Sequence, residues 1–261
     1  MDSNVPNKNN EVAEDEKPRE TTIEFLASLA ELLVIVLFIM TFVLQNFEIP
    51  SSSMEDTLLI GDHVFVNREQ FAPPTRWMGP LMPYREIHRD DIAVFFSPEQ
   101  QGLFLVKRII GVPGDRIHLR DGVVYRNGEK LDEPFALHKV ADYNPYRDNF
   151  PAVPPSEMYG VRNEKWTQEL PLHLQGDDIV VPANSYFAMG DNRDVSYDSR
   201  YWGFIPGNNV IGRPVFIYWS FVTPPNQYRL RGAGDRLAFL AHMVIHFFDE
   251  TRWSRTLRIV R

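Results

Sequence analysis

An apolar stretch near the start of the chain constrains its folding more than any other feature. Residues 23–44 consist of apolar side chains with four polar exceptions. Those exceptions are Glu24, Ser28, Glu31 and Thr41. Because a helix rises about 1.5 Å per residue, one over 23–45 would roughly match the ~30 Å hydrocarbon core of a bilayer. We therefore predict a transmembrane anchor over 23–45, with Glu31 near the headgroups. The alternative is a helix buried in a protein core.

The residues that flank this stretch predict its orientation. Residues 1–22 are polar and highly charged, which is typical of a disordered tail. Three basic residues lie in that tail, namely Lys8, Lys17 and Arg19. After the stretch, no Lys or Arg occurs before Arg68, and positive charge favours the cytoplasmic side. We expect a single-pass protein of the cytoplasmic membrane, with 1–22 in the cytoplasm and 46–261 outside. Residues 43–47 lack a small-x-small cleavage pattern, so we expect the anchor to stay attached.

Composition narrows the function classes. The formal net charge of −8 argues against a nucleic-acid partner, because phosphate binding relies on a basic surface. The chain has no cysteine, so disulfides and thiolate metal sites are excluded.

Beyond the apolar stretch, the pattern changes to short β segments separated by Gly, Pro, Asn and Asp. The predicted strands are 63–67, 92–96, 103–110, 116–119, 123–126, 178–181, 186–189 and 215–219. The dipeptides Asp121-Gly122 and Asn127-Gly128 flank one of them, and both readily form two-residue hairpin turns. Many short strands without a βαβ rhythm predict a mostly β fold, namely an antiparallel β domain.

Two later segments depart from this pattern. Residues 144–155 are rich in proline and polar groups and are expected to form a surface loop. Residues 237–248 form an apolar run that is too short to span a bilayer. We expect a short late helix there, packed on the domain or lying on a membrane surface.

Three motifs carry possible chemistry. Residues 47–62 contain the serines Ser51, Ser52 and Ser53, a pattern that alone indicates a solvated turn. Residues 105–115 place Lys107 inside an apolar strand, where a lone lysine often points outward. Residues 189–206 form a polar turn that leads to aromatic residues.

Taken together, these motifs resemble those of bacterial type I signal peptidases, which are Ser–Lys proteases. The resemblance covers the anchor and the three motifs in the family's order, and it continues weakly into Gly212-Arg213 and 252–255. It implies a membrane-bound serine endopeptidase that removes N-terminal signal peptides from exported preproteins. One departure is Asp56, where the family often has proline, and residues 237–248 look like an addition.

The resemblance also assigns roles to individual residues. Ser53 is then the nucleophile and Lys107 the general base. Ser51 donates to the oxyanion together with the Ser53 N–H, and Ser196 hydrogen-bonds Lys107 and orients it. Asp198 and Arg200 form a structural ion pair near the site. By their positions in the motifs, Asp191 and Arg193 are assigned to loop geometry.

The chemistry of lysine agrees with these roles. A serine hydroxyl needs a base to take its proton, and lysine can serve only when it is neutral. At an unperturbed pKa of ~10.4, fewer than about one lysine in a thousand is neutral near pH 7. Apolar neighbours of Lys107 in 105–110 would lower its pKa if that strand faces the interior.

The family's substrates carry small residues at the first and third positions before the cleaved bond. Carried over by motif position, six apolar residues would line the pockets for them: Phe47, Ile49, Met54, Leu58, Leu105 and Val106. We also expect residues 71–84, which include Trp77 and Tyr84, either to touch membrane lipid or to fold onto the core.

No cofactor is expected, because the chain has neither a Walker loop nor a dinucleotide fingerprint. His242 and His246 lie four residues apart, but no third ligand is evident nearby in the sequence, so no metal is expected. Two other functions compete with signal peptide removal. One is a catalytically inactive membrane-anchored scaffold of the same fold. The other is a Ser–Lys self-cleaving regulator, although such regulators carry a DNA-binding domain where this chain has its apolar stretch.

Overall fold

The computed structural model describes residues 21–68, 71, 85–152, 163–225, 227 and 232–260. Residues 1–20, which make up nearly all of the predicted tail, lie outside this range. So do most of residues 71–84, including Trp77 and Tyr84, which were expected at a membrane or on the core.

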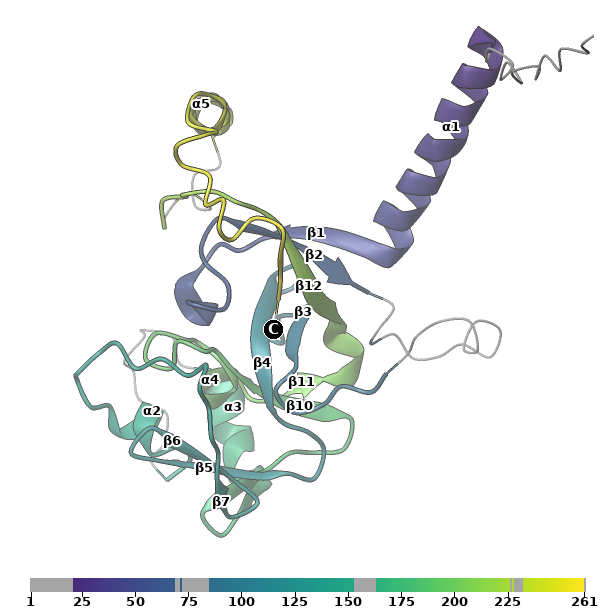
Figure 1. Ribbon diagram of the computed structural model, residues 1–261. Helices are drawn as coiled ribbons and strands as arrows, with labels where there is room; N and C mark the ends of the chain where they lie inside the picture. The colour runs from purple at the N-terminus through teal and green to yellow at the C-terminus, as the bar shows by residue number, and fades with distance from the viewer. Residues whose placement is uncertain are drawn as a thin grey trace, which may run out of the picture. The chain divides into compact units, whose positions relative to one another are not determined.

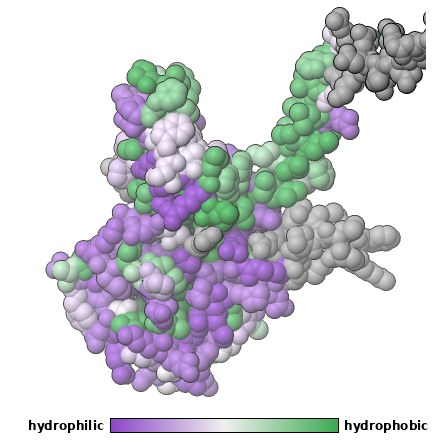
Figure 2. Space-filling view, viewed as in Figure 1, coloured by the Kyte–Doolittle hydropathy of each residue, from purple (hydrophilic) through white to green (hydrophobic). Residues whose placement is uncertain are grey.

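The chain divides into two compact units, 1–39 and 40–261. The helix of the first unit is α1 (Thr22–Phe38), and Thr21 and Glu24 close its N-terminus with a reciprocal capping box. Its apolar side chains are exposed, as Figure 2 shows. None of the helices in the described residues is both long and apolar enough to cross a membrane.

The predicted helix over 23–45 extends too far at its C-terminal end. Residues Ile39–Val43 form a π-helical turn, η1, and the strand β1 (Leu44–Glu48) follows directly. β1 pairs antiparallel with β2 (Asp62–Asn67), from Leu44 opposite Asn67 to Glu48 opposite His63. The backbone of Leu44 and Gln45 is therefore satisfied by a sheet, a pairing that hydrophobicity alone does not reveal.

Two antiparallel sheets form the second unit (Figure 1). The larger has eight strands in the order β1-β2-β12-β3-β4-β10-β11, with β13 paired to β12. Its remaining strands are β3 (Ile92–Phe96), β4 (Phe104–Gly111), β10 (Ser185–Met189), β11 (Ile205–Pro206), β12 (Val210–Ser220) and β13 (Arg258–Ile259). The mostly antiparallel β fold predicted from the sequence is thus confirmed.

The smaller sheet has five strands in the order β7-β6-β5-β9-β8. They are β5 (Arg116–Arg120), β6 (Val123–Arg126), β7 (Glu129–Lys130), β8 (Leu174–Gln175) and β9 (Asp178–Val180). At least one hairpin was expected from the two dipeptides, and both form one: Asp121-Gly122 joins β5 to β6, and Asn127-Gly128 joins β6 to β7. All four turn residues have positive φ, as such turns require.

Short helices complete the unit. They are η2 (Ser52–Met54), α2 (Pro145–Asp148), α3 (Glu164–Glu169), η4 (Leu170–His173), α4 (Ser199–Trp202), η5 (Gly207–Asn209) and α5 (Ala233–Ile245). The helix α5 confirms a helix in the late apolar run, shifted toward the N-terminus by several residues.

The prediction of a surface loop over 144–155 is wrong for its described part. The Asn144 side chain caps α2, and Tyr146 and Phe150 are buried in one apolar cluster with Trp166. Tyr146 also donates a hydrogen bond to the carbonyl of Arg200. The polar residues here serve as caps and ion pairs for a buried turn, so composition alone misplaces the segment.

One glycine is required where the chain returns from the nucleophile motif to β2. Gly61 has φ +83°, and a Cβ there would lie 2.2 Å from the Phe221 carbonyl oxygen. Gly128 also has φ +83°, but a Cβ there would meet nothing within 4 Å. A substitution by alanine would therefore strain the backbone equally at the two positions, but only at Gly61 would the new Cβ overlap neighbouring atoms.

We expect Gly61→Ala to destabilise the protein clearly more than Gly128→Ala. The Gly128 variant should lose about 1 kcal/mol for its left-handed backbone, whereas the Gly61 variant must also displace backbone atoms. Denaturant unfolding of the two variants in detergent measures the difference. Equal losses of stability would contradict the packing seen at Gly61.

Candidate active site

Ser53 is held in a short turn just after β1. It lies in η2, where the Glu55 N–H closes the turn on the Ser52 carbonyl at 3.1 Å. The Ser53 carbonyl accepts a hydrogen bond from the Asn192 N–H at 3.1 Å. On the other side, the fully buried Met54 side chain fixes the turn to the core. The Ser53 side chain therefore has a defined position in a mostly buried setting.

Lys107 reaches the same point from the middle of β4. Its strand is paired on both sides, with Ala93 opposite Lys107 in β3 and with β10 at the far edge. The Lys107 Nζ donates a hydrogen bond of 2.5 Å to Ser53 Oγ, across 54 residues of sequence. The side chain is buried, so the strand does face inward there, contrary to the usual outward lysine. The predicted serine and lysine are thus in direct contact.

Burial sets the protonation of this lysine. Removal from water lowers the pKa of Lys107 to about 8, because the charged form loses its hydration. The Asp198 and Asp191 carboxylates act in the opposite direction, and the Arg200 guanidinium adds to the lowering. At pH 7 about one lysine in ten is then neutral, compared with fewer than one in a thousand in water. The amine can therefore act as a base at an accessible pH.

Asp198 and Arg200 form a fully buried, two-point ion pair beside the lysine. The Arg200 Nε and Nη2 lie 2.9 and 2.8 Å from the two Asp198 oxygens. Burial alone would raise the pKa of Asp198, but the Arg200 charge and hydrogen bonds lower it, as does Lys107. Arg200 also donates to the Arg193 carbonyl at 2.8 Å. The pair fixes α4 to the preceding turn, as expected of a structural ion pair.

The two accessory serines differ in their placement. Ser51 is exposed, and its Oγ lies 3.4 Å from Ser53 Oγ. Ser196 is fully buried, and its hydroxyl forms no well-aligned hydrogen bond among the described residues, although it lies close enough to Asp198 to help lower the pKa of that carboxyl. The expected bond from Ser196 to Lys107 is therefore not formed here.

Gly190 explains how closely these segments approach one another. A Cβ at this position would lie 2.3 Å from Ser196 Oγ and 2.4 Å from the Ser53 carbonyl oxygen. The Gly190 N–H also donates to Asp198 at 3.1 Å. Only glycine allows the turn after β10 to pack against the nucleophile turn.

A second buried ion pair, not singled out in the sequence analysis, braces the same segments. Arg108 donates to both oxygens of Asp191 at 2.8 and 2.7 Å, and Thr57 donates to Asp191 at 2.6 Å. Its guanidinium also lies 3.9 Å from the centre of the Phe135 ring. One signal for this pair exists in the sequence. Adjacent Lys107 and Arg108 lie on opposite faces of one apolar strand, so each needs its own buried partner.

Arg193 has an equally well-defined partner. It donates to both oxygens of Glu133 at 2.8 and 2.7 Å, and to the Gly190 carbonyl at 3.1 Å. Together with Asp191, it holds the turn 190–193, in line with the loop role expected for both.

An apolar pocket of about 440 Å³ opens beside Ser53 and Lys107. Four of the six predicted specificity residues line it: Phe47, Ile49, Leu105 and Val106. Leu103 and Phe104 also line it and are about two-fifths exposed. The pocket can therefore hold a small apolar group next to the serine hydroxyl.

The other two predicted pocket residues lie elsewhere. Met54 and Leu58 have no exposed surface and pack with Val64, Ile92 and neighbouring residues in a core cluster. Neither lines the pocket. These two side chains anchor the nucleophile turn to the core. Motif position alone cannot distinguish residues that pack in this way from residues that contact the substrate.

Comparison with known proteins agrees with this geometry. Residues 22–219 match the model of a family described as signal peptidase, peptidase S26. Signal peptidase I of Pseudomonas aeruginosa is 30% identical over 223 residues, which cover 77% of this chain and 74% of the relative. A probable signal peptidase I-2 of Synechocystis is 31% identical over 207 residues, or 77% and 75% of the two chains.

Among solved structures, a crystal structure of a signal peptidase I from Enterococcus faecalis is similar. It shares 31% identity with a TM-score of 0.37, covering 49% of this chain and 97% of that one. The family model matches well over half of the chain, so this protein belongs to the signal peptidase family, peptidase S26.

Proposed function

We propose that this protein is a membrane-bound serine endopeptidase that removes N-terminal signal peptides from exported preproteins. The 2.5 Å contact between Lys107 Nζ and Ser53 Oγ carries the proposal. A lysine whose pKa is lowered to about 8 beside a serine is an activated pair, which speaks against an inactive scaffold. The family of the chain and the apolar pocket beside the serine support the substrate class.

In the proposed reaction, neutral Lys107 accepts the hydroxyl proton of Ser53 while Oγ attacks the scissile carbonyl carbon. The resulting oxyanion receives hydrogen bonds from Ser51 Oγ and the Ser53 N–H, which act where negative charge develops. The intermediate collapses to an ester, and the leaving amine takes the proton from Lys107. Water then attacks the ester, with Lys107 again accepting a proton, and Ser53 is regenerated.

The remaining predicted residues act through this pair. Ser196 is the proposed positioning residue for Lys107, because it is buried against Gly190 next to Ser53 and its hydroxyl can turn. The Asp198–Arg200 pair supports the same turn and contributes two opposing charges to the surroundings of the lysine.

The proposal includes a single-pass anchor formed by the apolar residues before β1 and an extracytoplasmic catalytic domain that begins with β1. The apolar stretch and the basic residues before it support this orientation. Signal peptides emerge from the same bilayer, so an anchor would hold the active site near its substrate and in contact with lipid.

The first test is cleavage of a preprotein by the full-length protein in detergent. We expect Ser53→Ala and Lys107→Arg to be inactive to a similar degree. The arginine variant keeps the positive charge but stays protonated at any accessible pH, so it cannot accept the serine proton. Ser52→Ala is the matched control, since it removes the neighbouring hydroxyl and should leave most activity. Substantial cleavage by Lys107→Arg would contradict the assignment of the base.

The pH dependence should follow the protonation of Lys107. Because its pKa is lowered to about 8, kcat/KM should rise with pH through that region and level off above it. Below it, each pH unit should reduce kcat/KM about tenfold, since the protonated amine cannot accept a proton. Initial rates at low substrate, with circular dichroism confirming a folded protein at each pH, give the profile. A midpoint near 10 would mean that the lysine is not desolvated.

Specificity should depend on Ile49, which lines the pocket while being almost fully buried. We expect Ile49→Ala to widen tolerance at the third position before the cut, while cleavage of alanine substrates largely survives. One methylene in a fitted pocket is worth ~1–3 kcal/mol, so the relative rate for a leucine substrate should rise. The measurement is kcat/KM for paired preproteins with alanine or leucine there. Leu172→Ala, at a side chain that is 80% exposed and not part of the pocket lining, is the control. An unchanged ratio would remove Ile49 from the pocket.

A further inference from the structure

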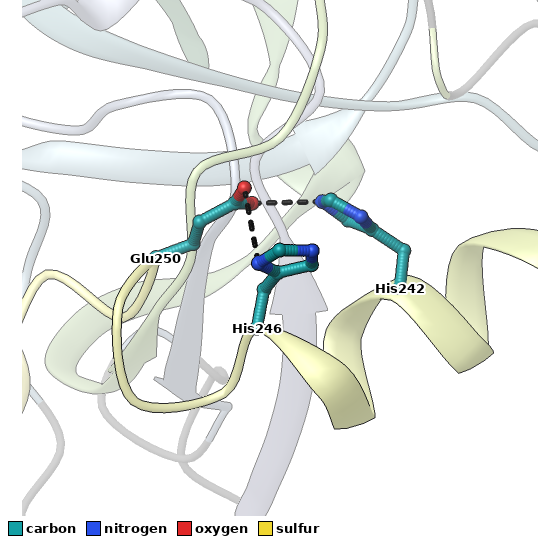
Figure 3. A group of neighbouring side chains, drawn as sticks. All are labelled: His242, His246 and Glu250. Atoms are coloured by element: carbon teal, nitrogen blue, oxygen red, sulfur yellow. Dashed lines mark hydrogen bonds and ion pairs between the residues drawn. The ribbon is translucent and has the colours of Figure 1, made fainter.

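The helix α5 ends in a group of side chains that the peptidase mechanism does not use. His242 lies in its last turn, His246 follows as its C-cap residue, and Glu250 comes one further turn along. The backbone continues the helical path, because the His246 N–H donates to the His242 carbonyl and the Glu250 N–H to the His246 carbonyl, both at 2.9 Å. Residues four apart on a helical path share one face. Figure 3 shows the carboxylate of Glu250 turned toward both imidazoles.

This geometry supplies the third ligand that the sequence alone did not reveal for His242 and His246. The His242 Nε2 is 2.8 Å from Glu250 Oε2, and the His246 Nδ1 is 3.9 Å from Glu250 Oε1. One ligand atom from each residue lies within 4.8 Å of the other two. Within the described part of the chain, no other group of three or more possible metal ligands meets so closely.

We propose that His242, His246 and Glu250 bind a zinc ion. Two imidazole nitrogens and one carboxylate oxygen are ligands that zinc commonly takes, with water in the fourth position. Bond lengths of about 2.0–2.2 Å in a tetrahedral site place neighbouring ligand atoms roughly 3.4 Å apart. One ligand atom from each of the three residues already lies within 4.8 Å of the others, so closing them to this spacing needs shifts of at most about 1.4 Å, which side-chain rotation can supply.

The local charges favour a divalent cation. Asp249 lies beside the group and hydrogen-bonds the His246 Nδ1 at 2.9 Å. Among the described residues, no Arg or Lys forms an ion pair with Glu250 or Asp249, so their carboxylates have imidazoles as partners. When the His246 nitrogen turns to the ion, Asp249 is placed to accept a hydrogen bond from the bound water. The three ligand side chains are about 28–41% exposed, which leaves the ion an entry path.

Zinc at this position would fix α5 to the β domain. The Glu250 carbonyl accepts a hydrogen bond from the Val222 N–H at 3.0 Å, and Thr251 forms a bridge with Phe221 just after β12. The Phe221 ring also lies edge-on to His242, with ring centres 6.1 Å apart. An ion held by the helix and by Glu250 would therefore close the helix onto the end of β12.

The test is a zinc titration of the full-length, tag-free protein in detergent after removal of metal with EDTA. A chromogenic zinc chelator competes for the ion and reports affinity and stoichiometry. We expect one zinc per chain, and binding at least about tenfold weaker in His242→Ala, His246→Ala and Glu250→Gln. Loss of a partner that merely orients a ligand already costs 10–100-fold, so loss of a ligand should cost no less. His138→Ala is the matched control, because His138 also faces a carboxylate, Asp194 at 3.2 Å, but has no second histidine beside it.

A second readout separates loss of the site from loss of folding. Cobalt should give the visible absorption of a tetrahedral site in the wild type and in His138→Ala, and not in the three ligand variants. Hydrogen exchange of 233–250 should slow on zinc addition in the wild type and in His138→Ala but not in the ligand variants, with circular dichroism confirming that every variant is folded. Binding that survives in Glu250→Gln and His246→Ala, or no binding at micromolar zinc, would overturn the proposal.

Discussion

The buried amine of Lys107 is the constraint on which the rest of the catalytic unit depends. A pKa lowered from 10.5 to about 8 corresponds to roughly 3 kcal/mol of lost stability at neutral pH. The sign follows from linkage: the unfolded chain binds the proton more tightly, so this loss is fully present below about pH 8. It disappears as pH rises toward 10.5, where both states are neutral. The surrounding structure must offset that loss, and it must do so without placing a free carboxylate beside the amine, which would restore the proton.

The buried ion pairs meet this requirement. Asp198 and Asp191 would each raise the pKa of Lys107, but each is bound at two points by its own arginine. Arg200 neutralises Asp198, and Arg108 neutralises Asp191. The two carboxylates can therefore stabilise the fold while raising the pKa of Lys107 only to a limited extent. Gly190 then allows the turn that carries these groups to lie against Ser53. Breaking either pair would leave a buried charge unpaired, and such changes are strongly destabilising.

The sequence predicted the parts of this arrangement that repeat a local pattern. β3 and β6 have the bounds expected from alternation and turn residues, and both Asn-Gly and Asp-Gly turns form. Ser53 and Lys107 were identified from motifs, because no local property of either residue indicates that they meet. The features that the sequence missed depend on distant partners. β1 is a strand because β2 pairs with it, and Met54 and Leu58 face the core instead of the pocket. Tyr146 and Phe150 are buried in one cluster with Trp166, and Tyr146 also bonds the Arg200 carbonyl in α4.

The segment after β12 forms a helix whose two flanking residues are held together at the edge of the domain. The excursion that contains α5 leaves the domain after Val222 and returns at Glu250, and these two residues are hydrogen-bonded to each other. This hydrogen bond holds the two ends of the segment together. The entropic cost of closing such a loop rises only slowly with its length, so a long segment is tolerated here. The chain beyond Glu250 is firmly tied to the nucleophile segment: Arg252 donates to the Ile60 carbonyl at 3.0 Å, and Arg255 to the Thr57 carbonyl at 3.0 Å and to Asp62 at 2.7 Å. The terminal arginines thus brace the chain between Ser53 and β2 from outside the motifs. Glu250, the proposed zinc ligand, lies two residues before Arg252, the first of these arginines. The same short stretch of backbone therefore connects α5 to the contacts that hold the nucleophile segment in place.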